Sequence, residues 1–96
     1  MYENKLNFLF EGRRELTIYL NYSEDLANAD HCSVCGKEDH LIYTHTLTNV
    51  EAYERSAPVG KKAMRRVVRH ITQHLCLNQS VCYTCWHRSL DSLETA

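Results

Sequence analysis

Two cysteine pairs with the spacing of metal ligands stand in separate parts of the chain. The first lies in HCSVCG, residues 31–36, and the second in VCYTCWH, residues 81–87. The two thiolates of a C-x-x-C segment can bind one ion because the chain between them turns back on itself, and two such segments complete a tetrahedral site. Four thiolates leave no open position for water, so we expect a single structural zinc ion. Its predicted ligands are Cys32, Cys35, Cys82 and Cys85.

Local features favour a metal over other uses of paired cysteines. Gly36 follows the first pair directly, where a metal knuckle requires a residue that is free to adopt a positive φ. We expect the second pair at the start of a helix, whose dipole favours the thiolate form. Redox pairs, disulfides and an iron–sulfur cluster are the alternatives, but there is no thioredoxin-like βαβ pattern and the usual cluster spacings differ. We expect the fifth cysteine, Cys76, to be a small buried apolar residue and not a ligand.

The elements that must position these cysteines can be outlined from the pattern of apolar residues. Residues 4–22 predict a β-hairpin, because apolar and polar residues alternate on both sides of Glu11-Gly12-Arg13-Arg14. A connector follows up to residue 30, in which Ser23 would cap a short helical turn. The β-branched and aromatic residues between Leu41 and Val50 predict one or two short strands. The alternating apolar residues of the hairpin are Leu6, Phe8, Phe10, Leu16, Ile18 and Leu20.

The clearest periodicity lies between about residues 61 and 75, after Pro58 and Gly60 break the chain. Apolar residues recur there at the spacing of one helix face, which predicts an amphipathic helix with its basic residues turned away. They are Met64, Val67, Val68, Ile71 and Leu75. A short final helix is expected from near the second cysteine pair, with Trp86, Leu90 and Leu93 on one side.

These elements predict a small α+β protein with a zinc staple. We expect one domain over residues 1–96, with the hairpin and connector in 1–30 and the zinc-binding module in 31–96. A chain of this size buries only roughly 60–65% of its surface on folding, so a metal would add needed stability. The N-terminal segment has neither a secretory signal nor a membrane span. We therefore expect a location in the cytoplasm, nucleoid or nucleus, without secretion.

The net charge of −1 conceals an uneven distribution. Ten of the twelve acidic residues lie at or before Glu54, whereas residues 55–90 contain seven Lys or Arg and no Asp or Glu. Basic residues on one helix face can neutralise successive phosphates and release counterions, which drives binding to DNA or RNA. The predicted contacts are Lys61, Lys62, Arg65, Arg66, Arg69 and Arg88. Tyr43, Tyr53 and Tyr83 would stack on bases if they are exposed, or else belong to the core.

The order of the predicted elements resembles that of the treble-clef zinc finger, in which a knuckle is followed by strands and then by a last ligand pair at the start of a helix. Over residues 31–90 the layout is similar to that of HNH nucleases. That resemblance implies an endonuclease whose catalytic residues would be His45, Asn78 and His87. The acidic residue that usually precedes the first histidine is Thr44 here, and Trp86 separates Cys85 from His87. Outside an active site, we expect His45 to be held in its strand by a hydrogen bond and His87 to be exposed.

The function that we expect is therefore that of a small, non-catalytic zinc protein that contacts nucleic acid in a regulatory role. The first alternative is a protein-interaction adaptor or an inhibitor of a larger enzyme, in which the hairpin edge adds to a partner's sheet or pairs with a second copy. The second is a degenerate HNH-type endonuclease, which would lack a carboxylate for magnesium between Lys61 and Leu90. His70 and His74 have the i, i+4 spacing of metal ligands, and Cys76 is the only candidate for a third ligand beside them.

Overall fold

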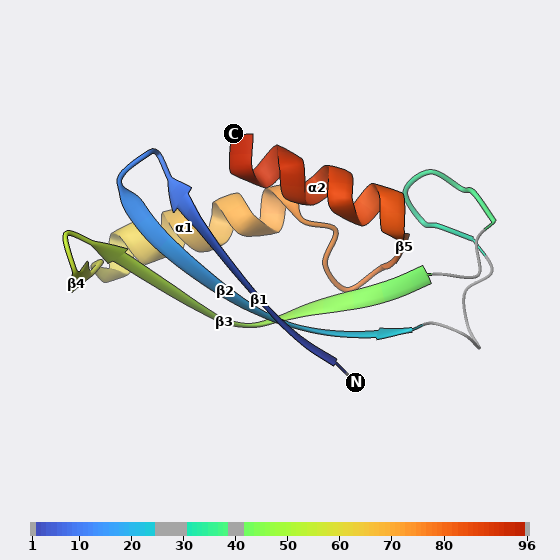
Figure 1. The fold of residues 1–96 in the computed structure, drawn as a ribbon, viewed down its shortest axis with the longest axis horizontal. Coiled ribbons are helices and arrows are strands. Elements are labelled where there is room, and N and C mark those ends of the chain that lie inside the picture. The colour runs from blue at the N-terminus through green and yellow to red at the C-terminus, as the bar shows by residue number, and fades with distance from the viewer. Residues whose placement is uncertain (1, 25–30, 39–41, 96) are drawn as a thin grey trace.

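The computed structural model describes residues 2–24, 31–38 and 42–95, which form an elongated α+β molecule of 44 × 24 × 18 Å (Figure 1). Every strand pairing is antiparallel, in the order β1-β2-β3-β4, and β5 pairs with the other end of β3. The elements along the chain are β1 (Tyr2–Phe10), β2 (Arg14–Glu24), β3 (Ile42–Glu54), β4 (Ala57–Pro58), α1 (Lys61–His74), β5 (Ser80–Cys82) and α2 (Tyr83–Thr95).

The predicted hairpin is confirmed as β1 and β2, and it is longer than the sequence indicates. Pairing runs from Tyr2 opposite Tyr22 to Phe10 opposite Arg14. The turn between the strands places both Glu11 and Gly12 at positive φ, 55° and 71°. The helical turn expected at Ser23 is wrong at that residue, because Ser23 continues β2 and pairs with Thr44 of β3. The rest of the connector, residues 25–30, lies outside the described residues.

The predicted one or two short strands are a single strand of thirteen residues, β3. It is long because it has a partner along both of its halves. β2 pairs with it from Glu54 down to Tyr43, with a register shift between Tyr19 and Leu20. Its first residues also pair with β5, where Ile42 lies opposite Cys82. β3 thus connects the hairpin with the second cysteine pair.

Both helices cover one face of the sheet (Figure 1). The alternation in the hairpin and the periodicity of residues 61–75 both point to this shared core, which packs β1, β2, β3, α1 and α2 together. Each large side chain that is fully buried contributes roughly 1.5–3 kcal/mol to stability. The buried members are Phe10, Leu16, Ile18, Leu20, Ala52, Val67, Ile71, Leu75, Trp86 and Leu93. Met64, Val68 and Leu90, also predicted for the core, are only partly buried.

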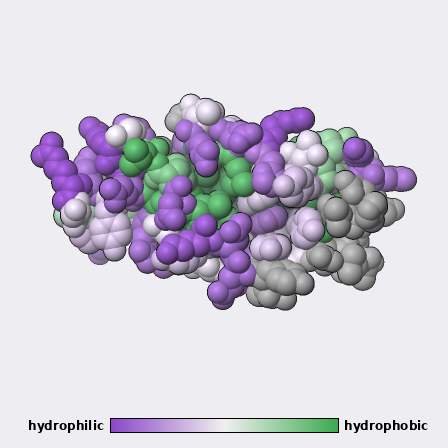
Figure 2. Space-filling view, viewed as in Figure 1, coloured by the Kyte–Doolittle hydropathy of each residue, from purple (hydrophilic) through white to green (hydrophobic). Residues whose placement is uncertain are grey.

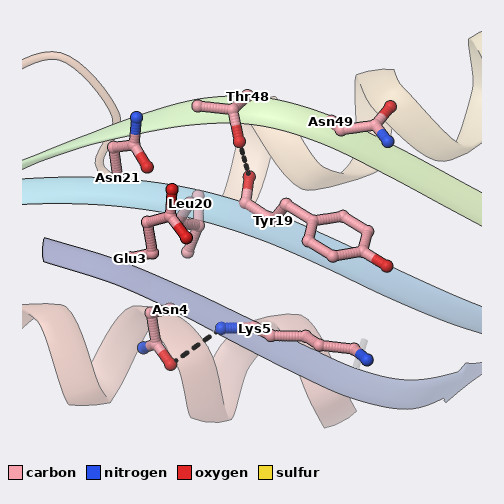
Figure 3. A pocket seen from close by; sticks show the side chains of 8 residues that line it. All are labelled: Glu3, Asn4, Lys5, Tyr19, Leu20, Asn21, Thr48 and Asn49. Carbon is pink, nitrogen blue, oxygen red and sulfur yellow. Dashed lines mark hydrogen bonds between the residues drawn. The ribbon is translucent and has the colours of Figure 1, made fainter.

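The opposite face of the sheet is polar. Its residues line an open hollow, in front of the strands in Figure 3, with the helices behind. Tyr19 donates a hydrogen bond from its hydroxyl to Glu51 (3.3 Å), and Thr48 donates one to the carbonyl oxygen of Tyr19 (3.0 Å). Seen as in Figure 1, hydrophobic residues gather toward the middle of the molecule with hydrophilic residues on either side (Figure 2). Within the described residues, neither helix has the length and apolar character to cross a membrane.

Candidate metal centre and aromatic hollow

The four predicted cysteine ligands come together. Their sulfur atoms all lie within 4.8 Å of one another, and those of Cys35 and Cys82 are 3.9 Å apart. Around a tetrahedral ion with metal–sulfur bonds of 2.3 Å, sulfurs would be separated by about 3.8 Å. The donor set and its spacing therefore fit a metal ion, which Cys32, Cys35, Cys82 and Cys85 could hold.

The first pair is shaped by a backbone turn. Cys32 donates a backbone hydrogen bond to the carbonyl of Lys37 (2.9 Å), and Gly36 donates one to the carbonyl of Cys32 (2.8 Å). Gly36 has a φ of 74°, which confirms the positive value that the sequence predicts. The backbone N–H of Val34 lies 3.4 Å from the Cys32 sulfur, to which it donates. The turn thus directs an N–H dipole at the sulfur and favours its thiolate form.

The second pair spans a strand and a helix. Cys82 is the last residue of β5, whereas Cys85 lies in the first turn of α2, so the helix start predicted for the pair is confirmed only for Cys85. The first turn also contacts this segment directly through hydrogen bonds. The Ser33 backbone N–H donates to the carbonyl of Ser80 (2.9 Å), and the Ser33 hydroxyl donates to the same oxygen (2.7 Å). Hydrogen bonds from Ser33 therefore join the first turn to β5 beside the four sulfurs.

The thiols of Cys32 and Cys85 do not ionise alike. Burial disfavours a thiolate at Cys32, but hydrogen bonds from the backbone N–H groups of Cys35, Cys82 and Val34 outweigh it and lower the Cys32 pKa. At Cys85, burial and then hydrogen bonds among the neighbouring sulfurs raise the pKa. One thiolate therefore forms readily, and a bound cation would favour ionisation of the others.

Cys76 packs beside the sulfur cluster without belonging to it. It is half-buried, so the fully buried position expected for it is only partly found. Burial, followed by the nearby charge of Cys32, raises the pKa of the Cys76 thiol. Its sulfur is not one of the four that meet.

His45 is buried in a stack of rings. Only 4% of its surface is exposed. Its ring lies parallel to Trp86, with centroids 3.6 Å apart and planes at 6°, and the Tyr22 ring stacks 5.3 Å away at 25°. The hydrogen bond expected to hold this ring is absent at Nδ1, which has no partner among the described residues. Ring stacking holds it instead, and burial lowers its pKa from 6.5 to about 4.

Two of the three residues suggested by the nuclease resemblance meet. His45 and His87 line the same aromatic hollow, which has a volume of about 190 Å³. His87 is exposed, as expected, with its ring 4.1 Å from that of Tyr83. Asn78 does not line the hollow; its backbone N–H donates to the carbonyl of His45 (2.8 Å). We define the aromatic hollow by its lining residues, Asn4, Tyr22, Tyr43, His45, Tyr83, Trp86 and His87.

No carboxylate lines the aromatic hollow in the described part of the chain. The sequence gives no local sign that Asn4 and Tyr22 belong to it. Both come from the hairpin, and they reach the hollow only because β2 pairs with β3. Sequence reasoning singled out Tyr43, Tyr83, His45 and His87 but had no way to gather them with the hairpin residues.

The basic residues predicted to contact nucleic acid are all exposed. Five of them lie on α1, and Arg88 lies on α2. Sequence reasoning missed one acidic partner, because Glu11 at the hairpin turn lies 3.4 Å from the guanidinium of Arg66. For the other basic residues of α1, no ion pair is formed within residues 2–24, 31–38 and 42–95. These are Lys61, Lys62, Arg65 and Arg69.

The two histidines of α1 do not form a metal site with a third ligand. Their rings are 4.5 Å apart, and His70 also packs against Phe10 at 4.7 Å. Nδ1 of His74 lies 3.0 Å from the Ser92 hydroxyl. No other His, Cys, Asp or Glu among the described residues joins them in a ligand group.

Comparison with other proteins identifies no relative. No family model matches the chain, and neither the curated proteins nor the solved structures yield a match. The function must therefore be argued from the residues of the site.

Proposed function

We propose that the four cysteines hold one structural zinc ion in a treble-clef-like arrangement. Zinc is favoured because a closed set of four thiolates in tetrahedral spacing is its usual structural site. The treble-clef comparison is supported by the order of the elements, in which a turn bearing Cys32 and Cys35 precedes β3, β5 and α2. The stretch containing α1 is inserted between β3 and β5.

The ion would tie the first turn to β5 and the start of α2. These segments already touch through Ser33 and Ser80, so the ion would lock an existing contact. Binding energies of about 10–16 kcal/mol for structural zinc in small peptides exceed the stability of many small domains. The proposed role of the metal is therefore to fix the C-terminal helix and the aromatic hollow against the sheet.

We further propose that this zinc-bound protein binds nucleic acid through the exposed basic face of α1, without cleaving it. The observation that carries the proposal is the charge of that face: Lys61, Lys62, Arg65 and Arg69 are exposed and form no ion pair with another described residue. The helix extends for about 21 Å at 1.5 Å per residue, which is enough to follow several phosphates.

The same helix is held rigidly from its other side. Val67 and Ile71 are fully buried in the core that α1 shares with the sheet. The basic face is therefore presented in a fixed orientation, and binding would not have to order the helix. This fixed orientation favours the interpretation that the basic face of α1 recognises a partner over the interpretation that it is only a solvated surface.

Binding without hydrolysis is favoured by the surroundings of His45. Both faces of its ring are covered, by Trp86 and by Tyr22, and the aromatic hollow lacks a carboxylate for a divalent ion among its described residues. Incubation with plasmid and Mg²⁺ or Mn²⁺ should leave the plasmid intact. Cleavage that disappears in His45→Ala would revive the nuclease alternative.

The binding proposal is tested with labelled duplex and single-stranded oligonucleotides at several salt concentrations. The logarithm of the affinity should fall linearly with that of salt, by about 0.9 for each duplex phosphate contacted or about 0.7 in a single strand. Arg65→Glu combined with Arg69→Glu should weaken binding and flatten the slope. Lys5→Glu with Lys37→Glu makes the same charge change elsewhere on the surface and should have a much smaller effect. Equal losses in the two double variants would reject α1 as the contact.

Native mass spectrometry tests the metal. The purified protein should carry one zinc ion that a chelator removes, and Cys35→Ser should abolish stoichiometric binding. Cys76→Ser is the matched control, because Cys76 packs against the cluster but lies outside the four-sulfur group. Full metal content in Cys35→Ser would contradict the assigned ligands.

A further inference from the structure

The aromatic hollow has two unlike sides. On one side is a fixed stack in which the His45 ring lies between those of Trp86 and Tyr22. The other side carries the Tyr83 and His87 rings, which are tilted by 42° at 4.1 Å and belong to exposed residues of α2. Tyr83 is 58% exposed. The lining therefore combines a buried stack of rings with two exposed rings.

The chemistry of the lining selects for a flat, uncharged ligand with polar edges. All but one of the seven lining side chains carry an aromatic ring, and none is a Lys, Arg, Asp or Glu. Asn4 and the tyrosine hydroxyls add groups that can hydrogen-bond with the edge of a ring. His45 also lines the hollow, although only 4% of its surface is exposed.

The hollow has room for about one ring system. A cavity of about 150 Å³ in an apolar core holds a single benzene ring. The volume here is about 190 Å³, which suits one nucleobase and not a stacked pair. A base buried in a duplex cannot present its face to side chains, whereas an unstacked base of a single strand can.

We propose that the aromatic hollow binds one unstacked nucleobase of a single-stranded nucleic acid. This inference rests on the proposed function and deepens it, because it names a single strand as the partner and adds a base contact to the phosphate contacts. Arg88 is exposed and follows His87 along α2; it is not one of the lining residues, but it is the basic residue nearest to them in the sequence of this helix. Base stacking on aromatic side chains combined with basic residues is a general mode of single-strand binding.

A methylammonium cation is the competing kind of ligand for a group of aromatic rings. Cation binding uses open ring faces, and indole is the best of them. The covered Trp86 face at 3.6 Å from His45 is closed to both ligands, so it does not distinguish them. No carboxylate from the described residues lines the hollow to balance a cation, and this feature favours the uncharged nucleobase.

The chain contains its own reporter for this test. Trp86 is the only tryptophan and it lines the aromatic hollow. Titration of the zinc-loaded protein with a short oligodeoxyadenylate should change the Trp86 fluorescence and saturate with the binding measured by anisotropy. A strand of the same length with abasic sugars retains the phosphates, and it should bind more weakly and leave the fluorescence unchanged.

Variants of Tyr83 locate the contact. Tyr83→Ala should weaken binding of the oligodeoxyadenylate by about 5- to 150-fold, the range that corresponds to one stacked base. Tyr83→Phe retains the ring and should restore most of the affinity. Tyr19→Ala is the matched control on the opposite face of the sheet, outside the aromatic hollow (Figure 3), and should bind like the unchanged protein. Zinc content is measured for each variant, because Tyr83 stands between two ligands.

The outcomes separate this inference from the proposed function. Salt-dependent binding that is the same for the abasic strand and for Tyr83→Ala would overturn the base site and leave the phosphate contact of α1 intact. Fluorescence quenching by free adenosine, lost in Tyr83→Ala, together with no binding of any strand would overturn both the proposed function and the single strand as the partner, and would leave a site for a free nucleobase only. A response to choline without one to adenosine would overturn the nucleobase as the ligand.

Discussion

Replacing His45 by phenylalanine should remove a pH dependence from the stability of this protein. The folded protein holds the His45 pKa at about 4, below its ordinary value of 6.5, because the ring is buried between Trp86 and Tyr22. Between these two values, the unfolded chain binds a proton that the folded protein does not. Stability must therefore fall as the pH falls through this window. Phenylalanine keeps a flat ring against Trp86 and cannot titrate.

The magnitude follows from the size of the shift. The difference of about 2.5 pKa units corresponds to about 3 kcal/mol at most, at a pH below both values. Most of the loss would require a pH at which the thiolates of the proposed zinc site would also become protonated. At pH 5.5, still above the folded pKa, the contribution of His45 is about 1.4 kcal/mol relative to pH 8. This is large enough to measure by denaturant unfolding.

The assay is urea unfolding followed by circular dichroism at intervals from pH 8 to pH 5.5, with zinc in excess. The expected result is that His45→Phe loses about 1.4 kcal/mol less than the unchanged protein over this range. Tyr43→Phe alters a neighbouring ring and leaves His45 in place, so it should keep the original pH dependence. Parallel curves for the unchanged protein and His45→Phe would refute the reasoning, because they would mean that His45 is not desolvated.

Two further predictions concern stability. Arg14 is 8% exposed, and its Nε and Nη1 have no partner among the described residues. Arg14→Met should therefore leave the free energy of unfolding unchanged or raise it by about 1–3 kcal/mol. A clear loss in urea unfolding would show that the guanidinium is paired in solution. Gly36→Ala should lower the free energy of unfolding by about 1–2 kcal/mol, because Gly36 has a φ of 74°. The new Cβ would meet no atom within 4 Å, so the loss would come from backbone strain alone. Gly60 also has open space around it but has a φ of −71°, so Gly60→Ala should lower the free energy of unfolding by less. Equal losses in the two variants would contradict backbone strain at Gly36.

Local signals in the sequence were enough for most of the elements. Period-two alternation places Leu16, Ile18 and Leu20 on one face of a strand because successive side chains point to opposite faces. Helical spacing of Val67 and Ile71 likewise predicts which side of α1 is buried. Both patterns depend only on near neighbours in the chain, which is why they predict elements without knowledge of the fold. The length of β3 was underestimated because it is set by its partners β2 and β5, not by its own residues.

The candidate metal site was also predictable, since a C-x-x-C turn is a local feature and four thiolates have few other uses in one small chain. The position of Gly36 at positive φ follows from the same turn. The meeting of the two pairs has a distant cause, however, because it requires β5 to pair with the first residues of β3.

The sequence by itself determined the strands of the hairpin, the buried and basic sides of α1 and the cysteine pairs, because each depends on residues close together in the chain. Only the tertiary structure decided the state of His45, the pairing of Glu11 with Arg66 and the gathering of rings in the aromatic hollow. These depend on strand register and on which helix covers which part of the sheet. No spacing along the chain encodes such contacts, because each joins side chains that become neighbours only after the sheet has formed.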